Sequence, residues 1–150
     1  MSNHLAVEQS QLGSGVQRLK TRPQFQAALA GGTVSRTPHF ALHRLNLPEA
    51  KPLASSEDSH IAPLFQTHEV WLGAMVPKRW AKRAVTRNAI KRQIYNVSAQ
   101  FEVRLPCAAH VVRLRSGFDR QQFISATSPM LKLAVRQELE QLFERAANKP

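Results

Sequence analysis

The sequence predicts a single-domain α+β sandwich in which helices cover one mixed sheet. The chain has 150 residues, of which 43% are hydrophobic, and a chain of this size usually forms one domain with its own core. Apolar residues alternate in several short segments, as in strands, and recur at helical spacing in longer segments near the middle and the end. The expected order is helix, short strands, helix, strand, helix, and the helices must cover at least one face of the sheet.

The domain is expected to span residues 17–147, after a disordered arm over residues 1–16, which are polar and aperiodic. A short first helix follows, because Thr21 and Gln24 form the pattern of a capping box. Phe25 lies on the apolar face of this helix, and a pair of glycines ends it.

Two short strands are predicted over residues 33–36 and 39–45, and Phe40 and Leu42 face one side of the second strand. Residues 46–68 are rich in proline and serine, and we expect a long mobile loop there. A linker between two domains is the alternative, but the chain that precedes it is too short to form a domain.

The strongest strand pattern covers residues 70–76, where Leu72 and Ala74 face one way and Gly73 faces the other. A glycine inside a strand has no side chain to fill the space above it. Gly73 therefore leaves a gap where the backbone of a ligand could approach closely.

A basic helix is predicted over residues 83–101. Residues 70–101 contain no acid but carry seven bases, namely Lys78, Arg79, Lys82, Arg83, Arg87, Lys91 and Arg92. On a helix, one row holds Arg87, Lys91 and Tyr95, and the row beside it holds Asn88 and Arg92. The opposite side gathers Ile90, Ile94, Val97 and Phe101. One face can thus enter a core while the other meets an anion, an arrangement that suits an RNA backbone.

A further strand is predicted over residues 110–115, with Val111, Arg113 and Arg115 on one face and His110, Val112 and Leu114 on the other. Ser128-Pro129 marks the start of the last helix. The apolar stripe of this helix holds Leu131, Val135, Leu139, Leu142 and Ala146. Three acids, Glu138, Glu140 and Glu144, are expected on its outside, away from the basic helix.

The net charge of +11 and the pI of about 11.1 indicate a polyanionic partner, and the patterned bases favour nucleic acid. The single cysteine, Cys107, cannot form an internal disulfide, and no group of cysteines and histidines has zinc spacing. No apolar run approaches the roughly 20 residues that span a bilayer, and the N-terminus lacks the apolar core of a signal peptide. We therefore expect a cytoplasmic protein without a membrane partner.

The segment from Leu72 to Val97 resembles the signature of the bacterial ribonuclease P protein subunit family. It reads LGAMVPKRWAKRAVTRNAIKRQIYNV. The matching pairs are Leu72-Gly73, Lys78-Arg79, Arg87-Asn88 and Lys91-Arg92. Residues 18–32, RLKTRPQFQAALAGG, resemble the opening of the family, and the resemblance covers about residues 18–146.

The resemblance implies an αβββαβα fold with a left-handed βαβ crossover, although such crossovers are right-handed as a general rule. It also implies a function as the protein subunit of the ribonuclease P ribonucleoprotein, which cleaves the 5′ leader from precursor tRNA. The RNA holds the catalytic Mg²⁺ ions, so the protein is expected to bind no cofactor alone and to supply no catalytic residue. Its partners are the ribonuclease P RNA and precursor tRNA.

The resemblance also assigns candidate contacts. The candidates for the RNA subunit are Lys78, Arg79, Lys82, Arg83, Arg87, Asn88, Lys91 and Arg92. Arginine can direct two N–H donors onto a phosphate, and lysine adds a point charge. The candidates for the leader, in a cleft over the sheet, are Phe25, Phe40 and Gly73. Either phenylalanine can stack on a base or can belong to the core instead.

Several positions depart from the family pattern. Leu29 stands where a second phenylalanine is frequent, Met75 where a small hydroxyl residue is usual, His43 where tyrosine is frequent, and Tyr95 where arginine is frequent. Aromatic stacking on the first helix is weakened by the first of these changes.

Two other functions fit parts of the sequence. A structural RNA-binding protein of ribosomal type would share the charge and the mixed fold, but it leaves the glycine-bearing strand before the Arg-Asn/Lys-Arg helix unexplained. A protein-only nuclease would need acids that converge on Mg²⁺. Only Glu69, Glu102 and Asp119 flank the basic region, and none of them has an acidic neighbour in sequence.

Overall fold

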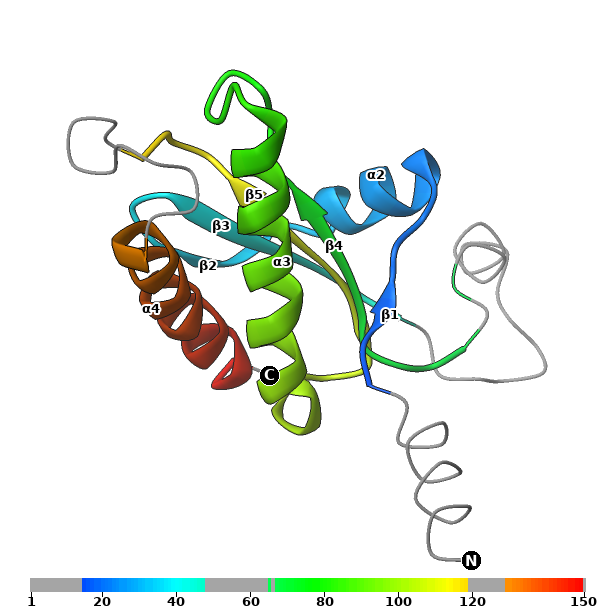
Figure 1. Cartoon of the computed structure of the whole chain (residues 1–150). Helices are drawn as coiled ribbons and strands as arrows, with labels where there is room; N and C mark the ends of the chain where they lie inside the picture. Colours follow the sequence, from blue (N-terminus) through cyan, green and yellow to red (C-terminus); the bar gives the residue numbers. More distant parts are fainter. Residues whose placement is uncertain (1–14, 48–64, 66, 119–128, 150) are drawn as a thin grey trace, which may run out of the picture.

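The computed structural model describes residues 15–47, 65, 67–118 and 129–149. It confirms the predicted class, because one five-stranded mixed sheet carries helices on both faces (Figure 1). The strands are β1 (Gln17–Arg18), β2 (Thr33–Arg36), β3 (Phe40–Asn46), β4 (Trp71–Met75) and β5 (Ala108–Leu114). The helices are α2 (Arg22–Ala30), α3 (Ala84–Gln100) and α4 (Pro129–Ala147), with a 3₁₀ turn, η2 (Glu102–Arg104), after α3. The arm and the loop expected over residues 1–16 and 46–68 lie almost wholly outside the described residues.

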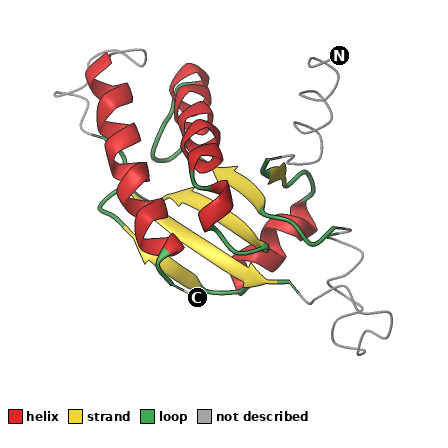
Figure 2. Ribbon diagram, turned by 90° about the horizontal axis from the view of Figure 1, so that it is seen from below, coloured by secondary structure: helices red, strands yellow, loops and turns green. Residues whose placement is uncertain are grey.

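The sheet order is β1-β4-β5-β3-β2. β4 lies parallel to both β1 and β5, whereas β3 lies antiparallel to β5 and β2. Helices α3 and α4 lie side by side on one face of the sheet, and α2 lies on the other (Figures 1 and 2).

The crossover from β4 through α3 to β5 is left-handed. In Figure 1 both strands point upward and α3 lies in front of the sheet, while the chain passes from β4 on the right to β5 on the left. The resemblance implied this uncommon hand, which the general preference for right-handed crossovers would not have predicted.

Alternation along the strands divides the apolar residues between two cores. The larger core lies under α3 and α4, and its strand residues are Phe40, Leu42, Leu72, Ala74, Val112 and Leu114. The smaller core lies under α2 and holds Leu19, Ala28, Phe65, Ala109 and Val111, with Phe25, Trp71 and Met75 packed against it. The predicted faces of the second, third and last strands are therefore confirmed.

Helix α2 begins as the sequence predicts. Gln24 N–H donates to Thr21 Oγ1 at 3.4 Å, and Thr21 N–H donates to Gln24 Oε1 at 3.1 Å, which completes the capping box. The helix ends at Gly31, where a Cβ atom would lie 2.6 Å from Leu45 Cα. Only glycine allows the end of α2 to lie this close to β3.

Helix α4 buries the whole predicted stripe, but one of its acids is not on the outside. Glu138 accepts hydrogen bonds from Thr37 Oγ1 at 2.6 Å, from His39 N at 2.6 Å and from His39 Nδ1 at 2.8 Å. The carboxylate therefore joins α4 to the turn between β2 and β3. The expectation that Glu138 faces solvent is wrong, because those donors lie at the sheet side of the helix.

Candidate nucleic-acid interface

The basic turn between β4 and α3 has a defined conformation. The backbone N–H groups of Trp80 and Ala81 both donate to Pro77 O, at 3.1 and 3.2 Å, and the Ala81 side chain is buried. The turn therefore presents the side chains around it outward. Those of Lys78, Arg79, Lys82 and Arg83 are all exposed.

Helix α3 continues this basic surface. Ile90, Ile94 and Val97 are buried against the sheet, which confirms the predicted apolar face. Asn88 and Arg92 are exposed on the far side, and Arg87 and Lys91 are half-buried along its flank. The eight candidates therefore lie on one continuous part of the molecule, formed by the turn and the helix, and we call it the basic surface.

Arg87 has a structural task as well as a charge. Its Nη1 donates to Ala81 O at 3.0 Å and to Lys82 O at 2.7 Å, so its guanidinium ties the turn to the first turn of α3. The remaining N–H donors of the group stay available to an anion, because a guanidinium has five.

The N-terminus of α3 is built for an anion. Arg83 is the N-cap residue and makes no side-chain capping bond, and the first turn contains no acid. The first N–H groups of a helix lack intrahelical partners, and the helix dipole places positive potential there. Bases at this end cost the free protein stability, which an anion bound to the same end would offset.

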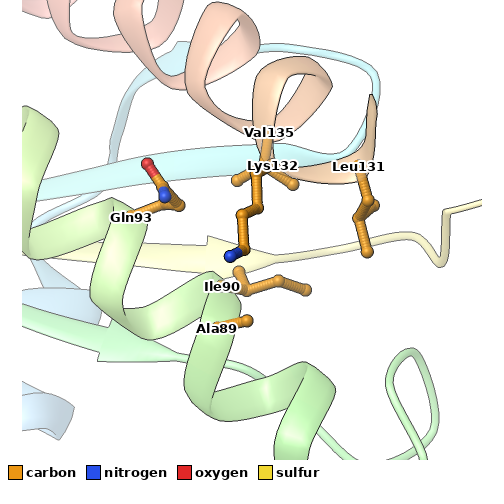
Figure 3. Close-up of a pocket in the computed structure, with 6 residues that line it drawn as sticks. All are labelled: Ala89, Ile90, Gln93, Leu131, Lys132 and Val135. Atoms are coloured by element: carbon orange, nitrogen blue, oxygen red, sulfur yellow. The ribbon is translucent and has the colours of Figure 1, made fainter. Parts of the chain in front are cut away.

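Tyr95 takes part in the basic surface through a neighbour. The guanidinium of Arg18, from the edge strand β1, lies 4.0 Å from the centroid of the Tyr95 ring. The row that begins with Arg87 and Lys91 thus ends with a positive charge supplied by another element. Lys132 of α4 adds a base on the opposite flank, where its ammonium group points toward α3 across a small hollow between the helices (Figure 3).

A second polar surface lies on the sheet face that carries α2. Arg113 Nε donates to His43 Nε2 at 3.4 Å, and His43 Nδ1 lies 3.3 Å from Thr33 Oγ1. Burial, with the positive charges of Arg113 and Arg36, lowers the pKa of His43, so this imidazole stays neutral near pH 7. We call Arg36, His43 and Arg113 the sheet cluster. It adjoins Met75, which faces Arg113 across the β4–β5 register.

Other kinds of site find no support in the described part of the chain. Residues 15–47, 65, 67–118 and 129–149 hold no group of three His, Cys, Asp or Glu side chains placed to bind a metal ion. Over the same residues, no helix has the length and apolar character to cross a membrane.

The sequence model of a family described as Ribonuclease P matches residues 14–147 of this chain. The chain belongs to the ribonuclease P protein family. The ribonuclease P protein component of Bordetella parapertussis is 33% identical over 130 residues, which are 87% of this chain and 91% of that protein. The component from Trichormus variabilis is 30% identical over 128 residues, 83% of this chain and 85% of that protein.

A solved structure shares the fold. The ribonuclease P protein of Staphylococcus aureus superposes with a TM-score of 0.59 and 20% identity, over 87% of this chain and 95% of that one. The two chains thus keep one architecture although four residues in five differ.

Two of the leader candidates of this ribonuclease P family member are corrected by the structure. Phe40 has no exposed surface, and its ring lies in the core under α3 and α4, on the opposite sheet face from Phe25. Gly73 does not leave an open gap, because the Phe25 ring occupies it. A Cβ atom on Gly73 would lie 2.7 Å from Phe25 Cζ and 2.9 Å from Leu19 Cδ1.

The remaining leader candidate is half-exposed. Phe25 rests one part of its ring over Gly73 and leaves another part at the surface. The sheet cluster, which sequence reasoning missed, lies on the same face. The alternation in β5 is a sequence signal for one member of this cluster. It places Arg113 on the sheet face opposite to Val112 and Leu114.

Proposed function

We propose that this chain is the protein subunit of a ribonuclease P and binds the catalytic RNA through the basic surface. The observation that carries the proposal is the acid-free stretch of turn and helix, which gathers eight basic and amide side chains around an uncapped helix N-terminus. Charged N–H donors and free backbone N–H groups are the partners that phosphate oxygens accept best.

The protein acts on this proposal as a binding and positioning subunit. The Mg²⁺ ions and the cleavage chemistry belong to the RNA, and no side chain of this chain enters the reaction. We also propose that the 5′ leader of precursor tRNA crosses the sheet face beside α2, where Phe25 offers a ring and the sheet cluster offers positive charge. Single-stranded RNA is held in this way by charge along its backbone and by rings under its bases.

Reconstitution tests the proposal directly. The purified chain is combined with the ribonuclease P RNA of the same organism, and removal of the 5′ leader from precursor tRNA is followed. We expect the chain to promote cleavage by the RNA and to cleave nothing by itself. Cleavage by the chain alone, or no effect on the RNA, contradicts the proposal.

A structural RNA-binding protein of ribosomal type remains the second candidate, because the basic surface would serve ribosomal RNA equally well. The RNA that copurifies with the chain from cells separates the two. Recovery of ribosomal RNA in place of a ribonuclease P RNA would favour the second candidate.

A further inference from the structure

Trp80 stands out among the exposed apolar side chains of the described residues. That set comprises Trp80, Val85, Val103, Met130 and Leu133, and Trp80 is its only aromatic member. This residue is 38% exposed in the turn between β4 and α3. The other tryptophan, Trp71, is half-buried, packs edge-on against Phe65 at 5.6 Å and donates its indole N–H to Thr67 O at 3.0 Å.

The backbone beneath Trp80 is held from two sides. Its N–H donates to Pro77 O at 3.1 Å within the turn. On the other side, a Cβ atom on Gly117 would lie 3.0 Å from Trp80 O, so the segment after β5 rests against this carbonyl. An indole on a fixed backbone loses little conformational entropy when a ligand covers it.

The surroundings of the indole specify the chemistry of that ligand. The Arg79 guanidinium lies 5.5 Å from the centroid of the Trp80 ring, within the range of a cation–π contact. Lys78, Lys82 and Arg83 are exposed close by in the chain, and the stretch holds no acid. An apolar protein segment would gain nothing from these charges, whereas a nucleotide offers a flat base for the ring and a phosphate for the cations.

We propose that the Trp80 indole is a stacking site for one unpaired nucleobase of bound RNA, with the Arg79 guanidinium directed at the phosphate of that nucleotide. The inference rests on the proposed function, since it places a base contact within the basic surface. Cation contacts alone hold any polyanion, so a stacked base would let the surface distinguish a looped or unpaired strand from a plain duplex.

Tryptophan fluorescence of the full-length Trp71→Phe chain tests the site, because Trp80 is then the only tryptophan. The chain is titrated with a single-stranded adenosine oligomer and with inorganic polyphosphate of equal charge. We expect the oligomer to quench the emission and polyphosphate to bind without quenching. An unchanged emission when the oligomer saturates the chain, or equal quenching by polyphosphate, overturns the proposal.

Affinity gives a second readout. Trp80→Leu should weaken binding of the oligomer by about 5- to 150-fold, the range seen when one stacking ring is removed, and Trp80→Phe should retain most of the affinity. Binding of polyphosphate should change little in both variants. Val85→Ala, at another exposed apolar side chain near the basic turn, is the matched control, and thermal unfolding checks each fold. An equal loss for oligomer and polyphosphate in Trp80→Leu contradicts stacking.

Three further outcomes are distinguishable. Vesicles that contain phosphatidylserine supply an anionic lipid surface, and a blue shift of the Trp80 emission with vesicles, without quenching by the oligomer, would overturn the RNA assignment. A different result is that the chain fails to promote cleavage by its ribonuclease P RNA while the oligomer still quenches Trp80. The stacking site is then supported and the ribonuclease P function is contradicted. If the chain promotes cleavage but Trp80→Leu binds the RNA as tightly as the parent, the stacking proposal is overturned and the proposed function is retained.

Discussion

Arg44 donates from Nε to Nε2 of His110 at 3.1 Å, and both side chains are buried between the sheet and α4. His110 Nδ1 donates in turn to Trp71 O at 3.1 Å, which fixes the neutral tautomer with its proton on Nδ1. Arg44 also donates from Nη2 to Ala146 O at 2.9 Å and from Nη1 to Lys149 O at 3.2 Å, so a strand residue caps the end of α4.

This pair predicts a loss of stability in mild acid. Burial and then the charge of Arg44 lower the pKa of His110 from 6.5 to about 4, because a proton on Nε2 would face another donor. The unfolded chain therefore binds more protons than the folded chain between pH 6.5 and pH 4. Neutral His110 therefore contributes on the order of 3 kcal/mol to the free energy of unfolding above pH 6.5. This contribution is lost as the pH falls from 6.5 to 4.

Urea unfolding from pH 7.5 to pH 4.5 measures this effect. His110→Gln keeps a polar group in the same place but does not titrate, so its stability should vary less with pH than that of the parent. Part of the pH dependence of the free energy of unfolding should persist in this variant, since the pKa of His43 is also lowered. The same slope in both chains would show that His110 is not the responsible group.

Glu138 and Glu140 form a matched pair on α4. Glu138 receives three short hydrogen bonds from Thr37 and His39, whereas the Glu140 side chain is 44% exposed and its Oε2 lies 3.7 Å from Arg136 Nε. We expect Glu138→Ala to lower the free energy of unfolding by about 2–3 kcal/mol, because hydrogen bonds to a charged group contribute strongly. Glu140→Ala should change it by less than about 0.5 kcal/mol. Equal effects in thermal unfolding would contradict the role given to Glu138.

Alanine variants of Arg87 and Arg92 should have different effects on the stability of the fold but similar effects on RNA binding. Alanine at either position removes a charged donor and should weaken binding to the RNA subunit by about 1.5–3 kcal/mol. Arg87→Ala also removes the two bonds to Ala81 O and Lys82 O, so it should cost about 1–2 kcal/mol of stability. Arg92→Ala, on the exposed side, should cost almost none. Ile94→Ala, at a fully buried position, should cost about 2–5 kcal/mol.

Binding to the RNA subunit should depend steeply on salt. Each phosphate contact changes the slope of log K against log salt by about −0.9 in a duplex and −0.7 in a single strand. Arg92→Ala should therefore make this slope shallower by about the contribution of one phosphate contact. Asn88→Ala should lower the affinity and leave the slope unchanged, since an amide carries no charge. A nearly flat dependence for the parent chain would contradict an interface made by the basic surface.

The sequence predicts those parts of the fold that local patterns determine. The capping box at Thr21, the two faces of β3 and β5 and the apolar side of α3 depend on residues near each other in the chain, and all are confirmed. The two-residue strand β1 is too short to carry a period. It forms because Gln17 N–H donates to Val70 O at 2.8 Å, a contact between distant segments.

The errors at the site have the same cause. Alternation placed Phe40 on one face of its strand, but only the packed structure shows that this face lies under α3 and α4 rather than under α2. The sequence predicts a gap at Gly73 because it does not show that the Phe25 ring fills this space. The cluster of Arg36, His43 and Arg113 joins three strands, so no single stretch of sequence displays it.

The role of Phe25 is the most direct test of the leader surface. Its ring fills the space above Gly73 and is also half-exposed, so packing and stacking both fit it. Phe25→Leu keeps an apolar side chain in that space but removes the flat ring. We expect this variant, assembled with the RNA subunit, to bind precursor tRNA more weakly by about 1–3 kcal/mol, the contribution of one stacked base. Its affinity for mature tRNA, which has no leader, should not change.

The affinities for precursor and mature tRNA are compared with the RNA subunit saturated by protein. A weaker assembly with the RNA subunit is then not mistaken for a weaker contact with the leader. Arg92→Ala serves as the control for assembly, because it should lower the affinity for the RNA subunit without separating the two tRNA forms. Thermal unfolding checks that Phe25→Leu is folded, since a large cavity above Gly73 would loosen α2 from the sheet. If the folded variant loses affinity for both tRNA forms equally, or for neither, Phe25 only packs against Gly73, and the leader contacts on this face reduce to the charges of Arg36 and Arg113.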